Sequence, residues 1–403
     1  MNKSEELVYK LCTKSFLSLW SYPNPQGKSG KELCDILVVC EPDIIIFSVK
    51  EIEFKDTGRP KIDFDKWRRK AIQESSKQIY GAERWINSNS NVITQNGEIG
   101  LSFTNVSNRR IHRIAVALGS QEKVPIHFGD FGKGFIHVLA EKSLDVLMNE
   151  LDTITDFVKY LTDKEDFFYK GKLTFFSGEE DLLAFYLSQG RTFPEEPSFV
   201  VLDDNLWDGF SKMSEVVAKK ERDDASYMWD YVIERLCQNY LDSNILPNVT
   251  NTPKNLSQFD NAIRYMAREN RFSRRHLGKS LIDLLQKSKS KSIKARISDS
   301  SISEIRYVFM IGDYDKNREL NFKELEARCL IARGINQEKQ TVIGLLIEFS
   351  EKQPGDAMTI LYLHVPDWTS EWQQQMEYLQ KELGYFTKPA MQNLGEDEYP
   401  KLD

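Results

Sequence analysis

Two strongly apolar stretches follow each other almost without a break, and they constrain the fold more than any other part of the chain. Residues 33–40 (LCDILVVC) and 43–51 (DIIIFSVKE) are separated only by Glu41 and Pro42. Runs of Val, Ile, Leu and Phe on either side of a turn predict two paired β-strands. Because apolar side chains would point to both faces of these strands, we expect other layers to cover both sides of the sheet.

Helix and strand patterns alternate around this pair of strands. We expect an amphipathic helix before it and a long helix after it, followed by two more strands and another helix. This order predicts a mixed α/β domain. The expected elements are a helix over 4–20, a helix over 63–86, strands over 111–118 and 135–140, and a helix over 144–161.

The rest of the 403-residue chain has a different pattern, and the length allows two or three domains. A mainly helical stretch is followed by three apolar, strand-like runs (IRYVFMI, TVIGLLIEF and MTILYLHV) that alternate with helical patterns. We therefore expect a mixed α/β domain over residues 1–162, a mainly helical region over 163–300 and a smaller α/β region over 301–403.

Three features of the sequence argue against particular classes of protein. No stretch approaches the run of about 20 apolar residues that a membrane span needs, so we expect no membrane partner. The N-terminal residues have no apolar signal-peptide core. The five cysteines are scattered without CxxC spacing, which predicts buried free thiols in a reducing compartment. A cytoplasmic location is therefore expected.

Charge is distributed unevenly along the chain. Eleven Lys and Arg residues against two acids lie between Arg264 and Arg296, although the net charge of the whole chain is −7. Such a basic segment predicts contacts with phosphates; a solvated helix face followed by a basic linker is the alternative. The residues expected to contact nucleic acid are Arg264, Arg268, Arg271, Arg274, Arg275 and Lys279, together with Arg68 and Arg69 beside Trp67.

Charged residues at the ends of the two apolar strands are candidates for chemistry. Alternation places Ser48 and Lys50 on one face of the second strand, and a hairpin would bring Asp35 beside them. An unpaired charge on a covered sheet is costly in free energy, so charged residues at these positions suggest a functional role. A carboxylate that holds Mg²⁺ and a lysine that stabilises a developing negative charge would suit phosphodiester hydrolysis. A strand-end cap at Asp35 and a Lys50 that extends to solvent are the structural alternatives.

At these positions the chain resembles the PD-(D/E)xK, or restriction-endonuclease-like, nuclease superfamily. That family has an acid on its first helix, an Asp on one strand, (D/E)-x-K on the next strand and a helix behind. The resemblance covers about residues 1–140 and implies a restriction-endonuclease-like αβ core. The resemblance implies that Asp35 binds metal and that Glu6 or Glu5 is the helix acid. It also implies that Ser48-Val49-Lys50 is the second motif, with the Val49 carbonyl as a metal ligand, and that Gln78 lies near the site.

The second motif departs from the family pattern because Ser48 stands where an acid is expected. Glu51 is adjacent but alternates to the opposite face of the strand. Glu74 shares a helical face with Gln78 and is the candidate to supply the missing carboxylate to the metal. The other interpretations are a weaker site with one metal ion, or a site that binds nucleic acid without cutting it.

The resemblance implies a nuclease that depends on Mg²⁺, with Mn²⁺ able to substitute. DNA is the expected substrate ahead of RNA, and defence against foreign nucleic acid is the expected role. We also expect either a homo-oligomer or a partner protein from a defence system. The alternative is a catalytically degenerate subunit that binds nucleic acid or a partner protein.

Overall fold

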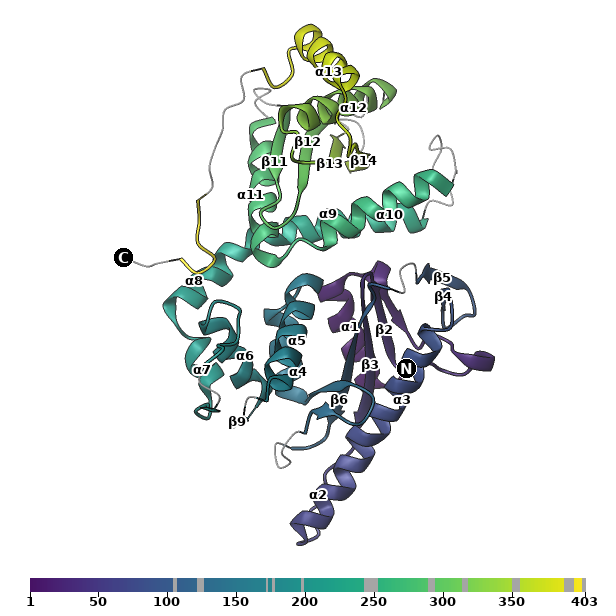
Figure 1. The fold of residues 1–403 in the computed structure, drawn as a ribbon, viewed down its shortest axis with the longest axis vertical. Coiled ribbons are helices and arrows are strands. Elements are labelled where there is room, and N and C mark those ends of the chain that lie inside the picture. Colours follow the sequence, from purple (N-terminus) through teal and green to yellow (C-terminus); the bar gives the residue numbers. More distant parts are fainter. Residues whose placement is uncertain are drawn as a thin grey trace. The chain divides into compact units, whose positions relative to one another are not determined.

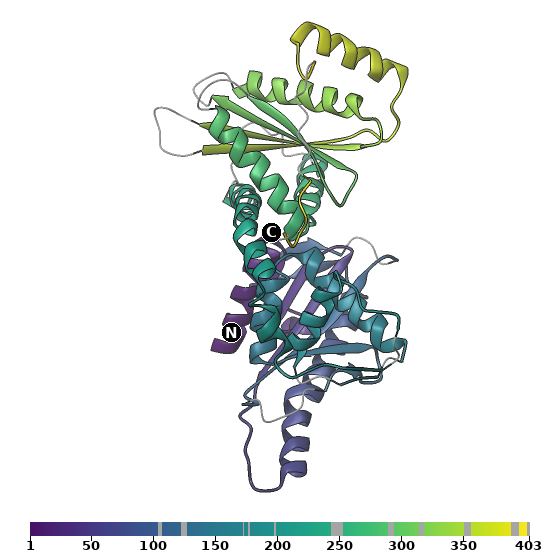
Figure 2. The ribbon, with the colours of Figure 1, turned by 90° about the vertical axis from the view of Figure 1, so that its left-hand side faces the viewer.

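The protein has two compact units, Met1–Val216 and Val217–Asp403, drawn in two views in Figures 1 and 2. The expected boundaries at residues 162 and 300 lie inside these units, so they describe a finer subdivision that stays a prediction. The computed structural model describes residues 1–103, 107–121, 127–171, 173–175, 178–196, 199–242, 253–288, 294–313, 318–349, 356–387 and 395–400.

A six-stranded mixed sheet is the centre of the first unit, which confirms the expected α/β class for this part of the chain. The two apolar stretches form the antiparallel pair β2 and β3, and β3 continues into a parallel pair with β6. In spatial order the strands are β1 (Ser21–Pro23), β2 (Ile36–Cys40), β3 (Asp43–Glu51), β6 (Arg110–Leu118), β8 (Phe135–Leu139) and β7 (Gly129–Asp130).

Helices cover both faces of this sheet, because both faces are apolar. On one face Ile79 and Ile86 of the long helix pack against Leu37, Ile44 and Ile46. On the other face the first helix contacts the strands and is followed there by two later helices. These helices are α1 (Lys3–Phe16), α2 (Pro60–Arg68), the π-helical turn η3 (Arg69–Gln73), α3 (Glu74–Ile86), α4 (Glu141–Glu150) and α5 (Ile154–Tyr169).

Shorter elements complete the first unit. Two small strand pairs, one antiparallel and one parallel, lie outside the central sheet. Two single-turn 3₁₀ helices lie between α1 and β2, and the last helix named here crosses the boundary between the units. These elements are η1 (Ser18–Trp20), η2 (Lys28–Gly30), β4 (Asn91–Ile93), β5 (Ile99–Ser102), β9 (Leu173–Phe175), α6 (Glu179–Ser188), β10 (Phe199–Val201), α7 (Leu206–Phe210) and α8 (Ser214–Asp223).

The second unit is also α/β, with a four-stranded sheet in the order β11-β12-β13-β14. Its three longer strands are the apolar runs identified in the sequence, and α12 connects the parallel pair β12 and β13. The elements are η4 (Asp224–Ser226), α9 (Tyr227–Asp242), α10 (Pro253–Ala267), α11 (Arg271–Ser288), β11 (Ala295–Asp299), β12 (Ile305–Asp313), α12 (Arg318–Ile335), β13 (Thr341–Phe349), β14 (Asp356–His364) and α13 (Ser370–Leu383).

All five cysteines are buried and free, as the sequence predicts. Burial raises the pKa of the Cys34 thiol, and the nearby carboxylates of Asp35 and Glu32 raise this pKa further. A buried thiol with a raised pKa is a poor nucleophile, so Cys34 belongs to the core. Among the helices that the structure describes, none has both the length and the apolar character needed to cross a membrane.

One close approach in the second unit gives the first testable prediction. A Cβ atom at Gly278 in α11 would lie 2.0 Å from the Ala225 carbonyl oxygen in η4, whereas a Cβ at Gly209 in α7 would meet nothing within 4 Å. We expect Gly278→Ala to lower the free energy of unfolding by about 2 kcal/mol through overpacking. The matched Gly209→Ala change should raise it by about 0.5 kcal/mol, because alanine favours a helix. Urea titration measures both, and an unchanged midpoint for Gly278→Ala would contradict this packing.

Candidate active site

Asp35 lies immediately before β2, opposite the end of β3. It is 1% exposed, and its Oδ2 accepts a hydrogen bond from the Val49 N–H at 2.5 Å. The Asp35 N–H donates to the Phe47 carbonyl oxygen at 3.2 Å. The side chain therefore bonds to the centre of the Ser48-Val49-Lys50 segment.

Ser48 and Gln78 join this strand end to the long helix. Ser48 is buried, and its Oγ donates to Gln78 Oε1 at 2.7 Å. The Gln78 Nε2 donates to Glu32 Oε1 at 3.5 Å. Gln78 therefore connects β3 to the loop that precedes β2. This contact also places the face of α3 that carries Gln78 toward the end of the hairpin.

Glu32 is the residue that the sequence reasoning missed. Burial raises the pKa of its carboxyl, and a hydrogen bond with Asp35 together with repulsion from Asp35 and Glu5 raises it further. The ammonium of Lys50 acts in the opposite direction and lowers this pKa. Two carboxyls and a lysine thus gather at the end of the β2–β3 hairpin. The available signal was a second acid three residues before Asp35, but it lies in a loop, outside the strands that alternation describes.

The two candidate acids of the first helix have different surroundings. Glu6 is 52% exposed on its side chain and pairs with Lys10 at 2.7 Å. A hydrogen bond and the charge of Lys10 lower the pKa of Glu6. Glu5 forms a capping box with Asn2 and acts electrostatically on Glu32. Of the two, Glu5 is therefore the acid associated with the site.

Glu74 and Glu51, the two further acids considered for the second motif, have no hydrogen bond with Asp35. Glu74 is exposed on α3, and its side chain has no hydrogen bond or ion pair with another described residue. Glu51 accepts a hydrogen bond from the Ser4 hydroxyl of α1, on the other face of the sheet. Neither side chain is positioned to replace the acid missing at Ser48.

The donors at this site fit Mg²⁺ in part. Across the described residues, no three His, Cys, Asp or Glu side chains are close enough to hold a metal ion. Glu32 and Asp35 form a carboxyl pair, and repulsion between them would be relieved by a cation. Mg²⁺ is commonly held by one or two carboxylates and keeps several waters, so such a pair suits it.

The basic segment of the second unit has a different environment from the one expected. Arg271, Arg274 and Arg275 are buried. The first two pair with Asp230 at 2.7 and 2.5 Å, and the third pairs with Asp223 at 2.7 Å. Burial alone would raise the pKa of Asp230, but these two arginines lower it. A guanidinium that is buried and already paired is not available to a phosphate, so nucleic-acid contact does not pass through these three arginines.

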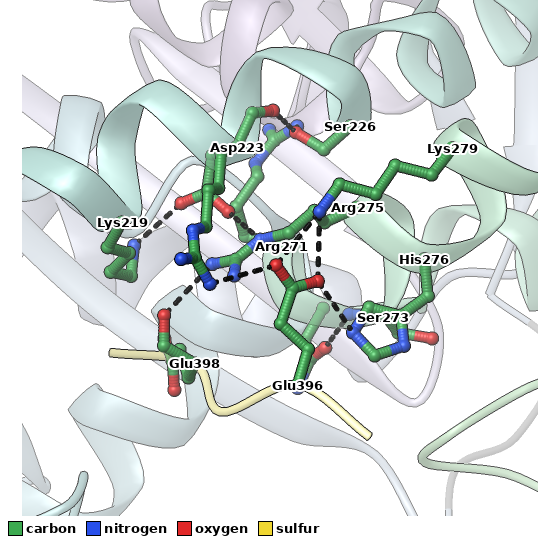
Figure 3. Close-up of polar contacts among 12 residues, drawn as sticks. Lys219, Asp223, Ser226, Arg271, Ser273, Arg275, His276, Lys279, Glu396 and Glu398 are labelled. Carbon is green, nitrogen blue, oxygen red and sulfur yellow. Dashed lines mark hydrogen bonds and ion pairs between the residues drawn. The ribbon is translucent and has the colours of Figure 1, made fainter. Parts of the chain in front are cut away.

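Most of the other described cations of this segment also have partners, whereas Lys294 is exposed and its side chain has none. Figure 3 shows Glu396 turned toward Lys279 and His276, with the Glu396 carboxylate 2.9 Å from the Lys279 ammonium. Arg275 lies between Asp223 and the carbonyl oxygen of Glu398 in the same view. Arg264 pairs with Asp260 at 2.9 Å, and Arg268 also has a partner. These ion pairs and hydrogen bonds hold α8, α11 and residues 395–400 together.

Arg68 and Arg69, the other two residues expected to contact nucleic acid, lie on α2 and η3 beside Trp67. Trp67 is buried, and its indole N–H donates to the Ile52 carbonyl oxygen at 2.6 Å. It is therefore not available for stacking on a base. Arg68 is partly buried and Arg69 is exposed.

Comparisons with protein-family models, with curated proteins and with solved structures found no match to this chain. A proposal about function therefore rests on the residues described above and on their chemistry.

The carboxyl pair gives a prediction for stability against pH. Because the folded state raises the pKa of Glu32, it holds that proton more tightly than the unfolded chain does, and stability falls as pH rises above about 4.5. Without divalent metal, Glu32→Gln should raise the free energy of unfolding at pH 7.5 by no more than about 0.5 kcal/mol, since the group is solvent-screened. The gain should vanish near pH 4. Urea titrations at both pH values measure it.

Glu53→Gln is the matched control for Glu32→Gln, because Glu53 is an exposed acid just after β3. Adding Mg²⁺ should stabilise the unaltered chain more than the Glu32→Gln chain. Equal behaviour of the two glutamine variants, with and without Mg²⁺, would refute the carboxyl pair.

A further prediction concerns the buried arginines. Arg274→Gln should lower the free energy of unfolding by about 3 kcal/mol, because it removes one partner of a buried ion pair. Lys287→Gln removes an exposed pair with Asp283 and should cost less than about 1 kcal/mol. Urea unfolding compares the two. Similar small losses would show that Arg274 does not support the fold in this way.

Proposed function

We propose that the first unit is a metal-dependent nuclease of the restriction-endonuclease-like type, acting on DNA with Mg²⁺, for which Mn²⁺ can substitute. The observation that carries this proposal is the convergence of Glu32, Asp35 and Lys50 at the end of an otherwise apolar hairpin. A buried carboxylate and an ammonium are costly at such a place unless they have a task.

The order of the surrounding elements supports the same proposal. A helix, α1, precedes the antiparallel pair β2 and β3, and α3 follows and packs behind them. Asp35 opens the first strand of this pair and Ser48-Val49-Lys50 ends the second. This is the order of elements and motifs that characterises the superfamily named above.

Each residue then has a chemical role. Glu32 and Asp35 would hold the metal ion, together with the backbone carbonyl of Val49. The bound ion would supply a water of lowered pKa and a positive charge next to the phosphate. Lys50 would stabilise the negative charge that develops on the phosphate oxygens. Ser48 would hold Gln78 in place by their 2.7 Å hydrogen bond, so that the Gln78 amide faces the substrate side.

A second candidate function is binding without cleavage. The observation that favours it is that Ser48 occupies the position of an acid and is engaged with Gln78. The site then has two carboxyls where the family supplies more. In this version the first unit would hold nucleic acid or a partner protein. The expected role in defence, the cytoplasmic location and assembly into a homo-oligomer stay predictions for either version.

Cleavage assays separate the two functions. The full chain would be incubated with plasmid DNA, linear DNA and RNA in Mg²⁺, Mn²⁺ or EDTA. We expect cleavage with either metal and none in EDTA. Asp35→Asn and Lys50→Ala should each reduce the rate about 100-fold or more, as loss of a preorganised charge does in other enzymes.

Glu32→Gln should reduce cleavage strongly, whereas Glu53→Gln should leave the rate unchanged. A rate that survives Asp35→Asn would disprove the proposed site. Binding of nucleic acid with no cleavage under any metal condition would favour the second candidate.

A further inference from the structure

The long helix of the first unit has an outer face with unpaired positive charge. Between residues 66 and 77, every exposed side chain is charged, and four of the five are cations. None of these five side chains has a hydrogen bond or ion pair with another described residue. These exposed residues are Lys66, Arg69, Lys70, Glu74 and Lys77. We name the four cations the α2–α3 ridge.

The ridge differs from the basic segment of the second unit in one physical respect. There, Arg264, Arg271, Arg274, Arg275 and Lys279 are paired with Asp223, Asp230, Asp260 or Glu396. A paired and buried cation contributes little to the potential outside the molecule, and an unpaired exposed cation contributes fully. The ridge is thus the better electrostatic footprint for an anionic ligand.

The inner side of the same helix is what holds it to the fold. Trp67 donates to the Ile52 carbonyl oxygen at 2.6 Å, and Ala71 and Ile72 are buried in the core. Asp63 accepts hydrogen bonds from the Thr57 N–H and hydroxyl at 2.7 and 2.8 Å. The outer cations take no part in these contacts. α2 extends away from the sheet of the first unit in both views (Figures 1 and 2).

The ridge is continuous with the candidate active site. Lys77 is the neighbour of Gln78, which bonds to Ser48 and Glu32. From Lys66 to Lys77 the helix rises by about 16 Å. The π-helical turn η3 lies within this stretch, and such turns are frequent at functional sites.

The geometry points to the α2–α3 ridge as the surface that binds the sugar-phosphate backbone of the nucleic acid beside the cleavage site. The identity of the ligand rests on the proposed function. Ammonium and guanidinium groups without partners are suited to phosphates. The ridge ends at Lys77, next to Gln78, which donates to Glu32 of the carboxyl pair. Phosphates along one strand would lie on the ridge while the reacting phosphate lies at Asp35 and Lys50.

The test uses binding without cleavage. In the full chain carrying Asp35→Asn, the three cations furthest from the site are replaced together by glutamine (Lys66→Gln, Arg69→Gln and Lys70→Gln). Fluorescence anisotropy measures the binding of labelled duplex DNA and duplex RNA in EDTA over a range of KCl. We expect binding to weaken about tenfold, with the slope of log K against log salt reduced by about two to three.

The matched control removes the same charge elsewhere: Lys170→Gln, Lys212→Gln and Lys381→Gln, three exposed lysines outside α2 and α3 whose side chains have no partner among the described residues. It should leave the affinity and the salt slope nearly unchanged. Equal effects of the two triple variants overturn the ridge, and so does failure of the Asp35→Asn chain to bind either duplex. Loss of affinity for both duplexes supports a backbone contact, and loss for one duplex alone identifies that nucleic acid as the ligand.

Cleavage by the chain with an intact Asp35 distinguishes the ridge from the proposed function. If the ridge variant raises KM and leaves kcat unchanged, both proposals hold. If the unaltered chain never cleaves but the ridge variant still loses binding, the nuclease proposal fails and the ridge remains a nucleic-acid surface.

Discussion

The hydrogen bond from the Val49 N–H to the Asp35 carboxylate ties the open end of the β2–β3 hairpin. A buried backbone donor needs a partner, and at this point the side chain supplies it in place of a strand carbonyl. The contact fixes a carboxylate opposite the end of β3. Ser48 and Lys50 flank Val49, so the position of the candidate site depends on this one bond.

Burial on both faces of the sheet explains why polar chemistry is confined to the ends of its strands. The middles of β2 and β3 are fully buried between helices, and a charge there would be costly. At the strand end, Gln78 from α3 and Glu32 from the preceding loop can reach the same place. Glu32 lies there beside Asp35, whose carboxyl raises the pKa of Glu32, so a cation would be favoured between them.

Much of the first unit could be predicted from periodicity alone. The strand pair and the helix behind it follow from side-chain alternation and helical spacing. The approach of Gln78 to Ser48 is implied by the family resemblance and not by periodicity. Glu32 could not be found from periodicity because it lies in a loop. Loops have no regular alternation, so the sequence pattern does not predict that the Glu32 side chain lies near Asp35. Glu74 shares a helical face with Gln78 but is exposed, and its side chain has no partner among the described residues.

The basic regions show a second limit of sequence reasoning, which concerns pairing. A count of charges along the chain identifies the stretch from Arg264 to Arg296, but its acids come from distant positions such as Asp223 and Glu396. The α2–α3 ridge is the opposite case. Between Lys66 and Lys77 there is one acid, Glu74, and its side chain makes no hydrogen bond or ion pair with the cations of the ridge. An anionic ligand is attracted by charged side chains that are exposed and unpaired. Tertiary contacts determine which of the charged residues in the sequence remain exposed and unpaired.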